Sequence, residues 1–209
     1  MVGSNLQMEP PMRRLTAPSL TALSLTLALT LPAFGQTLLS EATGNWAGAS
    51  NQGFYFRAQL SQNEDKARLT IWGGRTDGVP DASGDPEFDN DQIALGASAT
   101  RQALEVLETG NGSVLQVVTE FANEEAEGRS VVQIQYLDNQ YTVVGYYHLS
   151  RSYNPGGEPE IYECDVDLWN MVTIDNGQER QLQPVASEEL NASDWTFSAA
   201  FDRGYCTRT

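Results

Sequence analysis

The sequence predicts an all-β protein, with a single antiparallel up-and-down β-barrel of about eight to ten strands as the preferred architecture and a β-sandwich as the alternative. Two observations predict this class. Apolar and polar residues alternate with a period of two in segment after segment, while helical periodicity is nearly absent. Short turn sequences separate these segments. The barrel is preferred because closure removes exposed sheet edges.

The predicted strands each carry one apolar face and one polar face, as in an antiparallel sheet that covers a single core. The clearest alternation lies in residues 54–60, 66–71, 132–136, 164–168 and 195–201. Short turn sequences bound these and the intervening strands, namely Asn51-Gln52-Gly53, Asn63-Glu64-Asp65, Gly110-Asn111-Gly112, Asp138-Asn139 and Asn176-Gly177. Asn176-Gly177 is the strongest hairpin signal, because both residues tolerate positive φ.

Three stretches interrupt the alternation. Residues 74–92 are rich in Gly, Pro and Asp, residues 122–129 are acidic and polar, and residues 151–160 surround Pro155-Gly156-Gly157. We expect long loops there, and long loops on a rigid β scaffold often carry function. Residues 186–191 are a candidate short helix.

Residues 1–35 have the order of a secretory signal peptide. Met12-Arg13-Arg14 is basic, residues 15–32 are uncharged, and Ala33-Phe34-Gly35 supplies small residues for cleavage. A membrane anchor is the competing interpretation, although prolines and hydroxyl residues interrupt the run. The true start is predicted at Met12. We therefore expect a single β domain over residues 36–209, in the periplasm or outside the cell and not membrane-spanning after processing.

The chain is strongly acidic, with a formal net charge of −16. This excess of carboxylates repels phosphate, so nucleic acid and anionic membranes are excluded as expected partners. Cations and basic proteins are better candidates. Solubility alone is the alternative explanation of the acidity.

Cys164 and Cys206 are the two cysteines of the chain. In an oxidising compartment two cysteines usually pair, which predicts a disulfide that ties the C-terminus to an interior strand. A metal or redox pair is the alternative, but CxxC spacing is absent from the sequence.

The acidic loop from Asp77 to Asp91 is a candidate calcium site, with Asp81, Asp85, Asp89 and Asp91 as ligands. Calcium takes several carboxylate oxygens at close range. The spacing does not match an EF-hand, and a solvated loop is the alternative. No other cofactor is predicted.

Catalytic residues are not predicted. His148 is the sole histidine, its nearest serine in sequence is Ser150, and no G-x-S-x-G motif occurs. A strand histidine that forms a hydrogen bond is the favoured interpretation. Glu163, Asp165 and Asp167 share one strand face, as a pair of hydrolytic carboxylates would, but alternating charges also mark the wet side of a strand.

Four aromatic residues, Tyr55, Trp72, Tyr146 and Trp169, are out of phase with the clearest core positions near them. In a hollow barrel such residues line a ligand cavity. In a sandwich they would form an exposed patch or an oligomer contact. Ordinary packing beneath loops is the third interpretation.

Gly44-Asn45-Trp46 at the first strand and Arg203 after the last resemble the calycins, the lipocalin and avidin-like barrels. In that family a tryptophan of the first strand packs against a basic residue from the final one. The resemblance implies a barrel that binds a small apolar ligand, with Gly44, Trp46 and Arg203 in structural roles. The sequence departs from the family in the long acidic loop at 74–92.

Two functions follow as hypotheses. One is a non-enzymatic exported barrel that binds a small hydrophobic molecule. The other is an acidic protein-binding module, such as an inhibitor of a basic secreted enzyme like lysozyme. Tyr162-Glu163-Cys164 resembles the Tyr-x-Cys opening of periplasmic lysozyme inhibitors. An enzyme with an acid pair is a third interpretation.

Overall fold

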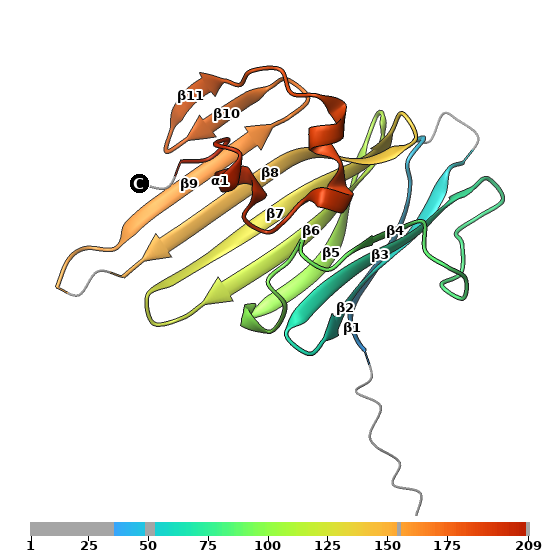
Figure 1. Cartoon of the computed structure of the whole chain (residues 1–209), viewed down its shortest axis with the longest axis horizontal. Coiled ribbons are helices and arrows are strands. Elements are labelled where there is room, and N and C mark those ends of the chain that lie inside the picture. The colour runs from blue at the N-terminus through green and yellow to red at the C-terminus, as the bar shows by residue number, and fades with distance from the viewer. Residues whose placement is uncertain (1–35, 49–52, 154–155, 208–209) are drawn as a thin grey trace, which may run out of the picture. The chain divides into compact units, whose positions relative to one another are not determined.

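A computed structural model describes residues 36–48, 53–153 and 156–207. The described chain is all-β and antiparallel, with two sheets of four and seven strands (Figure 1). The predicted signal peptide at 1–35, and residues Asn51 and Gln52 of the first predicted turn, lie outside the described residues. In the described residues, no helix has the length and hydrophobicity that a membrane crossing requires.

The four-stranded sheet has the order β1-β2-β3-β4. Its strands are β1 (Thr37–Asn45), β2 (Tyr55–Asn63), β3 (Lys66–Arg75) and β4 (Phe88–Asn90). The β2–β3 hairpin closes through the predicted turn at 63–65, where Glu64 has a φ of 53°. The predicted loop at 74–92 starts inside β3 and contains β4. This short strand pairs with β3 and forms the edge of the sheet.

The seven-stranded sheet has the order β11-β10-β9-β8-β7-β6-β5. Its strands are β5 (Arg101–Thr109), β6 (Gly112–Ala122), β7 (Ala126–Leu137), β8 (Gln140–Ser152), β9 (Glu160–Asp167), β10 (Val172–Asp175) and β11 (Gln178–Gln181). Every neighbouring pair follows in sequence, as an up-and-down meander requires.

The hairpin turns of this sheet lie where the sequence predicts them. Asp138 and Asn139 have φ values of 48° and 64°, and Asn176 and Gly177 have 48° and 76°. These left-handed pairs match the twist of the strands that they join. The polar stretch at 122–129 is mostly strand, because only residues 123–125 separate β6 from β7.

The two sheets are open, which corrects the closed barrel and agrees with the sandwich alternative. β1 and β5 lie next to each other, but side chains rather than a backbone ladder join the sheets. The Leu104 amide donates to Ser40 Oγ (2.9 Å), and the Asn45 amide donates to Ser113 Oγ (2.9 Å). Each sheet therefore keeps its edge strands.

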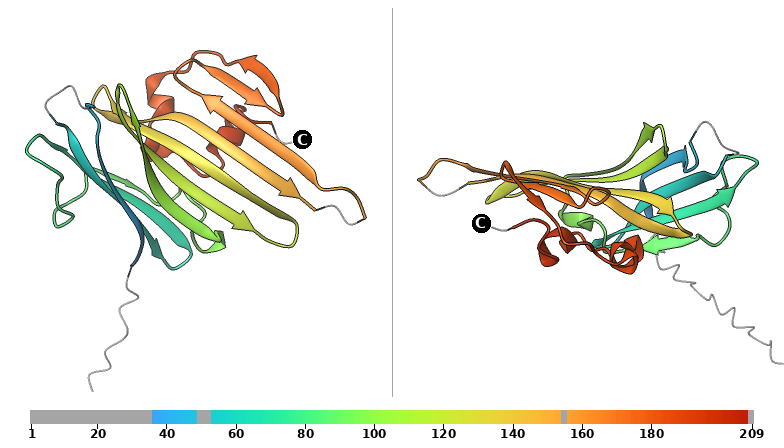
Figure 2. Two further views of the ribbon diagram at one scale, coloured as in Figure 1. Left: turned by 180° about the vertical axis from the view of Figure 1, so that it is seen from behind. Right: turned by 90° about the horizontal axis from the view of Figure 1, so that it is seen from above.

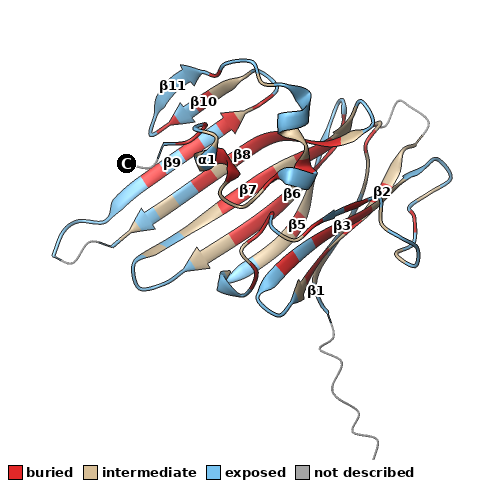
Figure 3. Cartoon of the chain, in the orientation of Figure 1, coloured by how far each residue is buried: buried red, intermediate tan, exposed pale blue. Residues whose placement is uncertain are grey.

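A single cluster of buried residues lies between the sheets and continues beneath the C-terminal segment. Figure 3 colours the buried positions along the strands red. From the four-stranded sheet come Phe56, Leu60, Leu69 and Ile71, and from the seven-stranded sheet come residues such as Leu115, Val117, Val132 and Ile134. Gly44 has a packing reason, because a Cβ there would lie 2.5 Å from the Phe56 ring. Interdigitated side chains thus leave little space in this part of the core.

The C-terminal segment, residues 183–207, is helical and irregular, which corrects the strand predicted over 195–201. It contains the short helices η2 (Ser187–Leu190), η3 (Ala192–Asp194) and α1 (Ala199–Asp202), and η2 confirms the candidate helix at 186–191. The Asn191 side chain caps η3 by accepting from the Ser193 amide (3.0 Å). The strand prediction at 195–201 was wrong although the alternation is clear. The stretch contains no turn sequence, and no described strand pairs with it.

Candidate functional site

A pocket of about 370 Å³ lies between the inner face of β6–β9 and the C-terminal segment. We call it the aromatic pocket. Its residues from the sheet are Phe121, Ala126, His148, Ser150, Ser152, Glu160 and Tyr162. Its residues from the C-terminal segment are Phe197, Ser198 and Phe201. The position follows from register, because Gly128, Ser150 and Tyr162 are paired across β7–β9 and so share one face.

Aromatic rings form most of the apolar wall. Phe201 packs edge-on against His148 at 5.1 Å and lies 5.9 Å from Tyr162, measured between ring centroids. Phe121 stacks on His148 at 5.8 Å and meets Phe197 edge-on at 6.4 Å. These offset and edge-on contacts are the favourable aromatic geometries, so the wall is ordered before any ligand enters.

One side of the pocket is polar. On the inner face of β8, the side chains change from the buried Tyr146 and His148 to the half-buried Ser150 and Ser152. Glu160 of β9 is exposed at the mouth of the pocket. His148 is only 8% exposed, and its Nδ1 lies 2.7 Å from Ser130 Oγ. The favoured interpretation of a hydrogen-bonded strand histidine is confirmed, although the partner is Ser130 and not Ser150.

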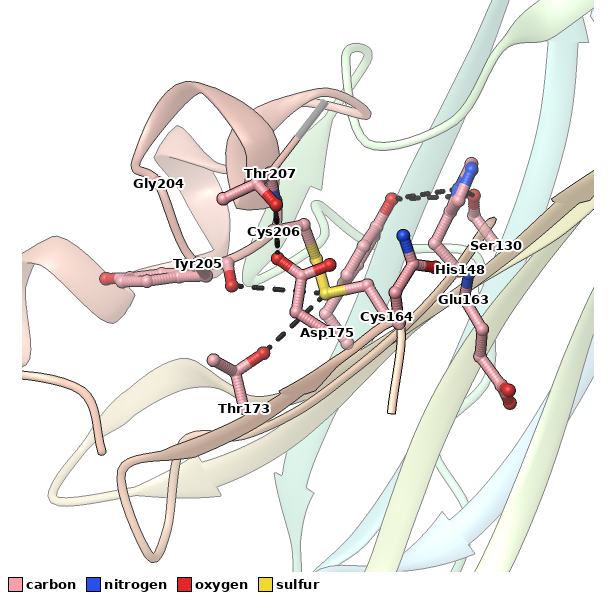
Figure 4. Close-up of a disulfide and its surroundings, with 12 residues drawn as sticks. Ser130, His148, Glu163, Cys164, Thr173, Asp175, Gly204, Tyr205, Cys206 and Thr207 are labelled. Atoms are coloured by element: carbon pink, nitrogen blue, oxygen red, sulfur yellow. Dashed lines mark hydrogen bonds between the residues drawn. A yellow bond between two sulfur atoms is a disulfide. The ribbon is translucent and has the colours of Figure 1, made fainter. Parts of the chain in front are cut away.

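Four sets of contacts fix the C-terminal segment over the sheet. The predicted disulfide between Cys164 and Cys206 is present, with its Cα atoms 5.9 Å apart (Figure 4). Asp175 Oδ2 accepts from the amide (2.9 Å) and hydroxyl (2.6 Å) of Thr207. Arg180 donates to the carbonyls of Gly204 (3.1 Å) and Tyr205 (2.9 Å).

The fourth contact is a buried asparagine. Asn90 Nδ2 donates to the carbonyls of Ala192 (2.7 Å) and Trp195 (2.9 Å), while its Oδ1 accepts from the Gln92 amide (2.7 Å). The Phe197 amide also donates to the Gln92 carbonyl (2.8 Å). The cover of the pocket is therefore tied to β4 at one end and to β9–β11 at the other.

The Tyr162 hydroxyl faces the same tether. Burial, and then the neighbouring Asp175 carboxylate, raise the pKa of Tyr162 above its ordinary value. The phenol is thus held neutral, and Tyr162 contributes an uncharged ring to the pocket wall.

The four aromatic residues predicted to bind a ligand do not share a cavity. Trp72 is half-buried on the four-stranded sheet and donates from Nε1 to the Gly84 carbonyl (2.8 Å), and Tyr55 lies at the start of β2. Trp169 is 59% exposed in the turn after β9. Tyr146 alone lies near the aromatic pocket, because its ring packs against Phe201 with a centroid distance of 6.3 Å.

The residues behind the calycin resemblance have other neighbours. Trp46 is buried and stacks on Phe56, with 3.9 Å between ring centroids. Arg203 lies over the Trp195 ring at 4.7 Å instead. The resemblance implies a contact between Trp46 and Arg203. In the structure Arg203 packs on Trp195 of the C-terminal segment instead.

The acidic loop does not assemble a calcium site among the described residues, where no group of three or more potential metal ligands occurs. Asp89 is paired with Arg68, and Asp91 with Lys66 (2.6 Å). Asp81 accepts from the amide of Ser83 (3.0 Å). The carboxylates are separated because β4 directs Asp89 toward the cations of β3.

None of the residues that line the aromatic pocket was predicted from the sequence to bind a ligand. His148 and Ser150 were considered as members of a catalytic relay, not as ligand-binding residues. The sequence contains one indication of this pocket. Along the alternate residues of β8 that face inward, large side chains at Tyr146 and His148 give way to small, polar ones at Ser150 and Ser152. Such a change marks the point where a strand leaves the packed core. The contribution of Phe197 and Phe201 depends on tertiary packing of the C-terminal segment.

Comparison of the chain with protein-family models, with curated proteins and with solved structures found no match.

Proposed function

We propose that this protein binds a small, predominantly apolar molecule in the aromatic pocket and does not act on it chemically. The observation that carries the proposal is a pocket of about 370 Å³ whose walls are aromatic rings and whose cover is tethered at both ends. Pockets for small ligands are concave, mostly apolar and preformed, and they carry a few polar groups that orient the ligand.

The polar side of the pocket limits the ligand's chemistry. Ser150 and Ser152 offer hydroxyl groups, and Glu160 adds a carboxylate at the mouth. The whole chain has a net charge of −16, so an anionic ligand would be repelled. An apolar body with a neutral or cationic polar end fits this arrangement best.

A catalytic role is less well supported. The Ser130 hydroxyl is within hydrogen-bond reach of His148 Nδ1, but Ser130 is 1% exposed and does not line the pocket. A nucleophile has to reach its substrate. Glu163, Asp165 and Asp167 lie on the opposite face of the sheet, so no acid pair faces the pocket from β9.

The proposal includes an exported location, in the periplasm or outside the cell. Its support is the Cys164–Cys206 disulfide together with the signal-like order of residues 1–35. Disulfides persist mainly in oxidising compartments.

Titration with the neutral dye N-phenyl-1-naphthylamine tests the binding proposal. We expect a saturable rise in fluorescence, and weaker binding of the anionic dye 8-anilinonaphthalene-1-sulfonate. Ser150→Phe places a ring in the pocket and should weaken binding of the neutral dye about tenfold, or about 1.4 kcal/mol.

Leu107→Phe is the matched control, because it adds a ring at an exposed position of β5 far from the pocket. It should leave the dye affinity unchanged. Absence of saturable dye binding by the wild type, or equal affinity in Ser150→Phe and the wild type, would contradict the proposal. If the dye binds as expected, native mass spectrometry of protein from its own host would identify the bound molecule.

A further inference from the structure

The outer face of β8–β10 carries apolar and acidic side chains in register. Across β8 and β9, Leu149 is paired with Glu163 and Tyr147 with Asp165, and Ile174 of β10 is paired with Asp165. Ile161 and Asp167 extend the same face of β9 in both directions. We call these side chains the outer patch: Tyr147, Leu149, Ile161, Glu163, Asp165, Asp167 and Ile174.

The outer patch is open to solvent in the described part of the molecule. Ile161 is 66% exposed, Ile174 44% and Leu149 38%. A groove of about 280 Å³ lies beside Leu149 and Ile161 at the edge of the outer patch, where Glu127, Arg129 and Arg151 also line it. In the view from behind and in the view from above, the C-terminal segment lies on the other face, and no described segment crosses this one (Figure 2). Clustered exposed apolar side chains of this kind mark interaction sites.

The carboxylates of the outer patch have no cationic partner among the described ion pairs. The Glu163 carboxylate accepts from the Tyr147 hydroxyl (3.0 Å), and the Asp167 carboxylate accepts from the Trp169 and Asn170 amides. Partial burial, and then the like charges of Asp167 and Glu163, raise the pKa of Asp165. The patch therefore presents negative charge that the chain itself leaves unneutralised.

The outer face of the four-stranded sheet is different. There Glu41 is paired with Arg57 (2.6 Å), Asp89 with Arg68 and Asp91 with Lys66. The acids on this outer face are thus paired with cations, whereas the three carboxylates of β9 are not.

We propose that the outer patch binds a cationic protein partner whose contact surface places apolar side chains between basic ones. Ile161, Leu149 and Ile174 supply the apolar contacts, and the three carboxylates of β9 supply complementary charge. Charge complementarity of this kind accelerates association and selects the partner. The surface is distinct from the aromatic pocket, which lies on the opposite face of the sheet.

A second copy of the chain fits this surface less well. A two-fold contact brings the same patch of both copies together, so the acids of β9 would face a surface that carries the same acids. Nucleic acid and anionic membranes are disfavoured by the same charge.

The test uses two labelled peptides, one of alternating lysine and leucine and one of alternating glutamate and leucine, with binding measured by fluorescence anisotropy. We expect the wild type to bind the lysine peptide and not the glutamate peptide. The triple variant Glu163→Gln, Asp165→Asn and Asp167→Asn should weaken binding about tenfold at low salt, with a smaller difference at high salt. Ile161→Thr should weaken it about threefold to tenfold.

Two matched controls separate the patch from total charge and from exposed leucine in general. The triple variant Glu64→Gln, Asp65→Asn and Asp85→Asn removes the same charge from the β2–β3 turn and from the loop between β3 and β4. Leu107→Thr removes an exposed leucine from β5. Both should bind the lysine peptide within about twofold of the wild type. Equal losses in the control triple, or no loss in Ile161→Thr, would overturn the proposal.

Sedimentation analysis and dye titration complete the test. A wild-type dimer that Ile161→Thr dissociates would overturn the proposal in favour of a second copy. All patch variants should keep the wild-type affinity for N-phenyl-1-naphthylamine, so failure of this proposal is distinguishable from failure of the pocket proposal.

Discussion

Two regions of the inner face of the seven-stranded sheet have different covers. Over the first, which we call the sheet-covered region, β1–β4 contribute residues such as Phe56 and Leu69 to one packed cluster with Leu115 and Val117. Over the second, the segment-covered region, the C-terminal segment with its short helices covers His148, Ser150 and Tyr162. The first region is filled, and the second contains the aromatic pocket.

The difference shows how this fold makes space for a ligand. A strand offers a side chain at every second residue, so two facing sheets can interdigitate along their length. The C-terminal segment is irregular instead. It buries residues such as Trp195 and Ala200 in the same core cluster. Its tethers are Asn90 of β4 at one end, and Asp175, Arg180 and the disulfide of β9–β11 at the other. Between these points the cover cannot fill the space beneath it, and the pocket remains.

Removal of the disulfide should produce the largest effect and should affect the segment-covered region. The double variant Cys164→Ala, Cys206→Ala opens a loop with a sequence separation of 42 residues. On the chain-entropy model this lowers the free energy of unfolding by about 4 kcal/mol. Urea denaturation measures the loss, and dye titration should show weaker binding because the cover of the pocket loses a tether. Unchanged dye affinity would mean that the remaining tethers suffice.

Leu69→Ala should affect the sheet-covered region alone. Leu69 is fully buried between the sheets, so its truncation leaves a cavity and lowers the free energy of unfolding by about 3 kcal/mol. Because the aromatic pocket has a different cover, the affinity for N-phenyl-1-naphthylamine should not change. A variant that loses stability and dye binding together while still folded would show that the two regions are coupled.

Local sequence rules predicted the sheet-covered region better than the segment-covered one. The alternation at 54–60 and 66–71 and the turns at Asn63-Glu64-Asp65 and Asp138-Asn139 depend on neighbouring residues, and the structure confirms these strands and turns. Whether the sheets close into a barrel depends on the contact between β1 and β5, which are far apart in sequence. The side chains of Ser40, bonded to β5, and Ser113 of β6 join the sheets there in place of backbone pairing. Periodicity carries no information about such contacts.

The same local rules did not predict the structure of the segment-covered region. The alternation of Trp195, Phe197, Ala199 and Phe201 is typical of a strand, but residues 195–198 are irregular and α1 begins at Ala199. The Cys164–Cys206 disulfide was predictable from cysteine count, but the tethers formed by Asn90 and Arg180 were not. A binding site assembled by such long-range contacts becomes visible only in the folded chain.

Each region contains a buried tyrosine whose raised pKa should make the protein less stable at alkaline pH. Burial, and then the Glu87 carboxylate at 3.1 Å, raise the pKa of Tyr141 in the sheet-covered region, as burial and Asp175 do for Tyr162. Because the folded-state pKa exceeds the unfolded one, stability is retained below about pH 10 and falls above it. The slope for Tyr141 is about 1.4 kcal/mol per pH unit. Tyr141→Phe should flatten the pH dependence measured by urea denaturation above about pH 10.

The smallest effects should distinguish the outer faces of the two sheets. The hydrogen bond from Arg68 lowers the pKa of Asp89, so its contribution to stability is present at neutral pH and lost as the pH falls. For Asp165, partial burial and then its acidic neighbours raise the pKa, so stability is lost as the pH rises and the carboxyl ionises. At neutral pH, Asp89→Asn should therefore lower the free energy of unfolding by about 0.5 kcal/mol, and Asp165→Asn should raise it by about 0.3 kcal/mol.

Opposite signs are the informative part of this last prediction, because both variants remove one exposed negative charge from a chain with a net charge of −16. A general relief of repulsion would stabilise both variants alike. Urea denaturation at neutral pH and again well below the ordinary aspartate pKa of about 4, far enough to protonate Asp89 as well, separates the explanations: the difference between the variants should vanish in acid. If Asp165→Asn is destabilising at neutral pH, the outer patch does not carry uncompensated charge, and its proposed complementarity to a cationic partner loses its physical basis.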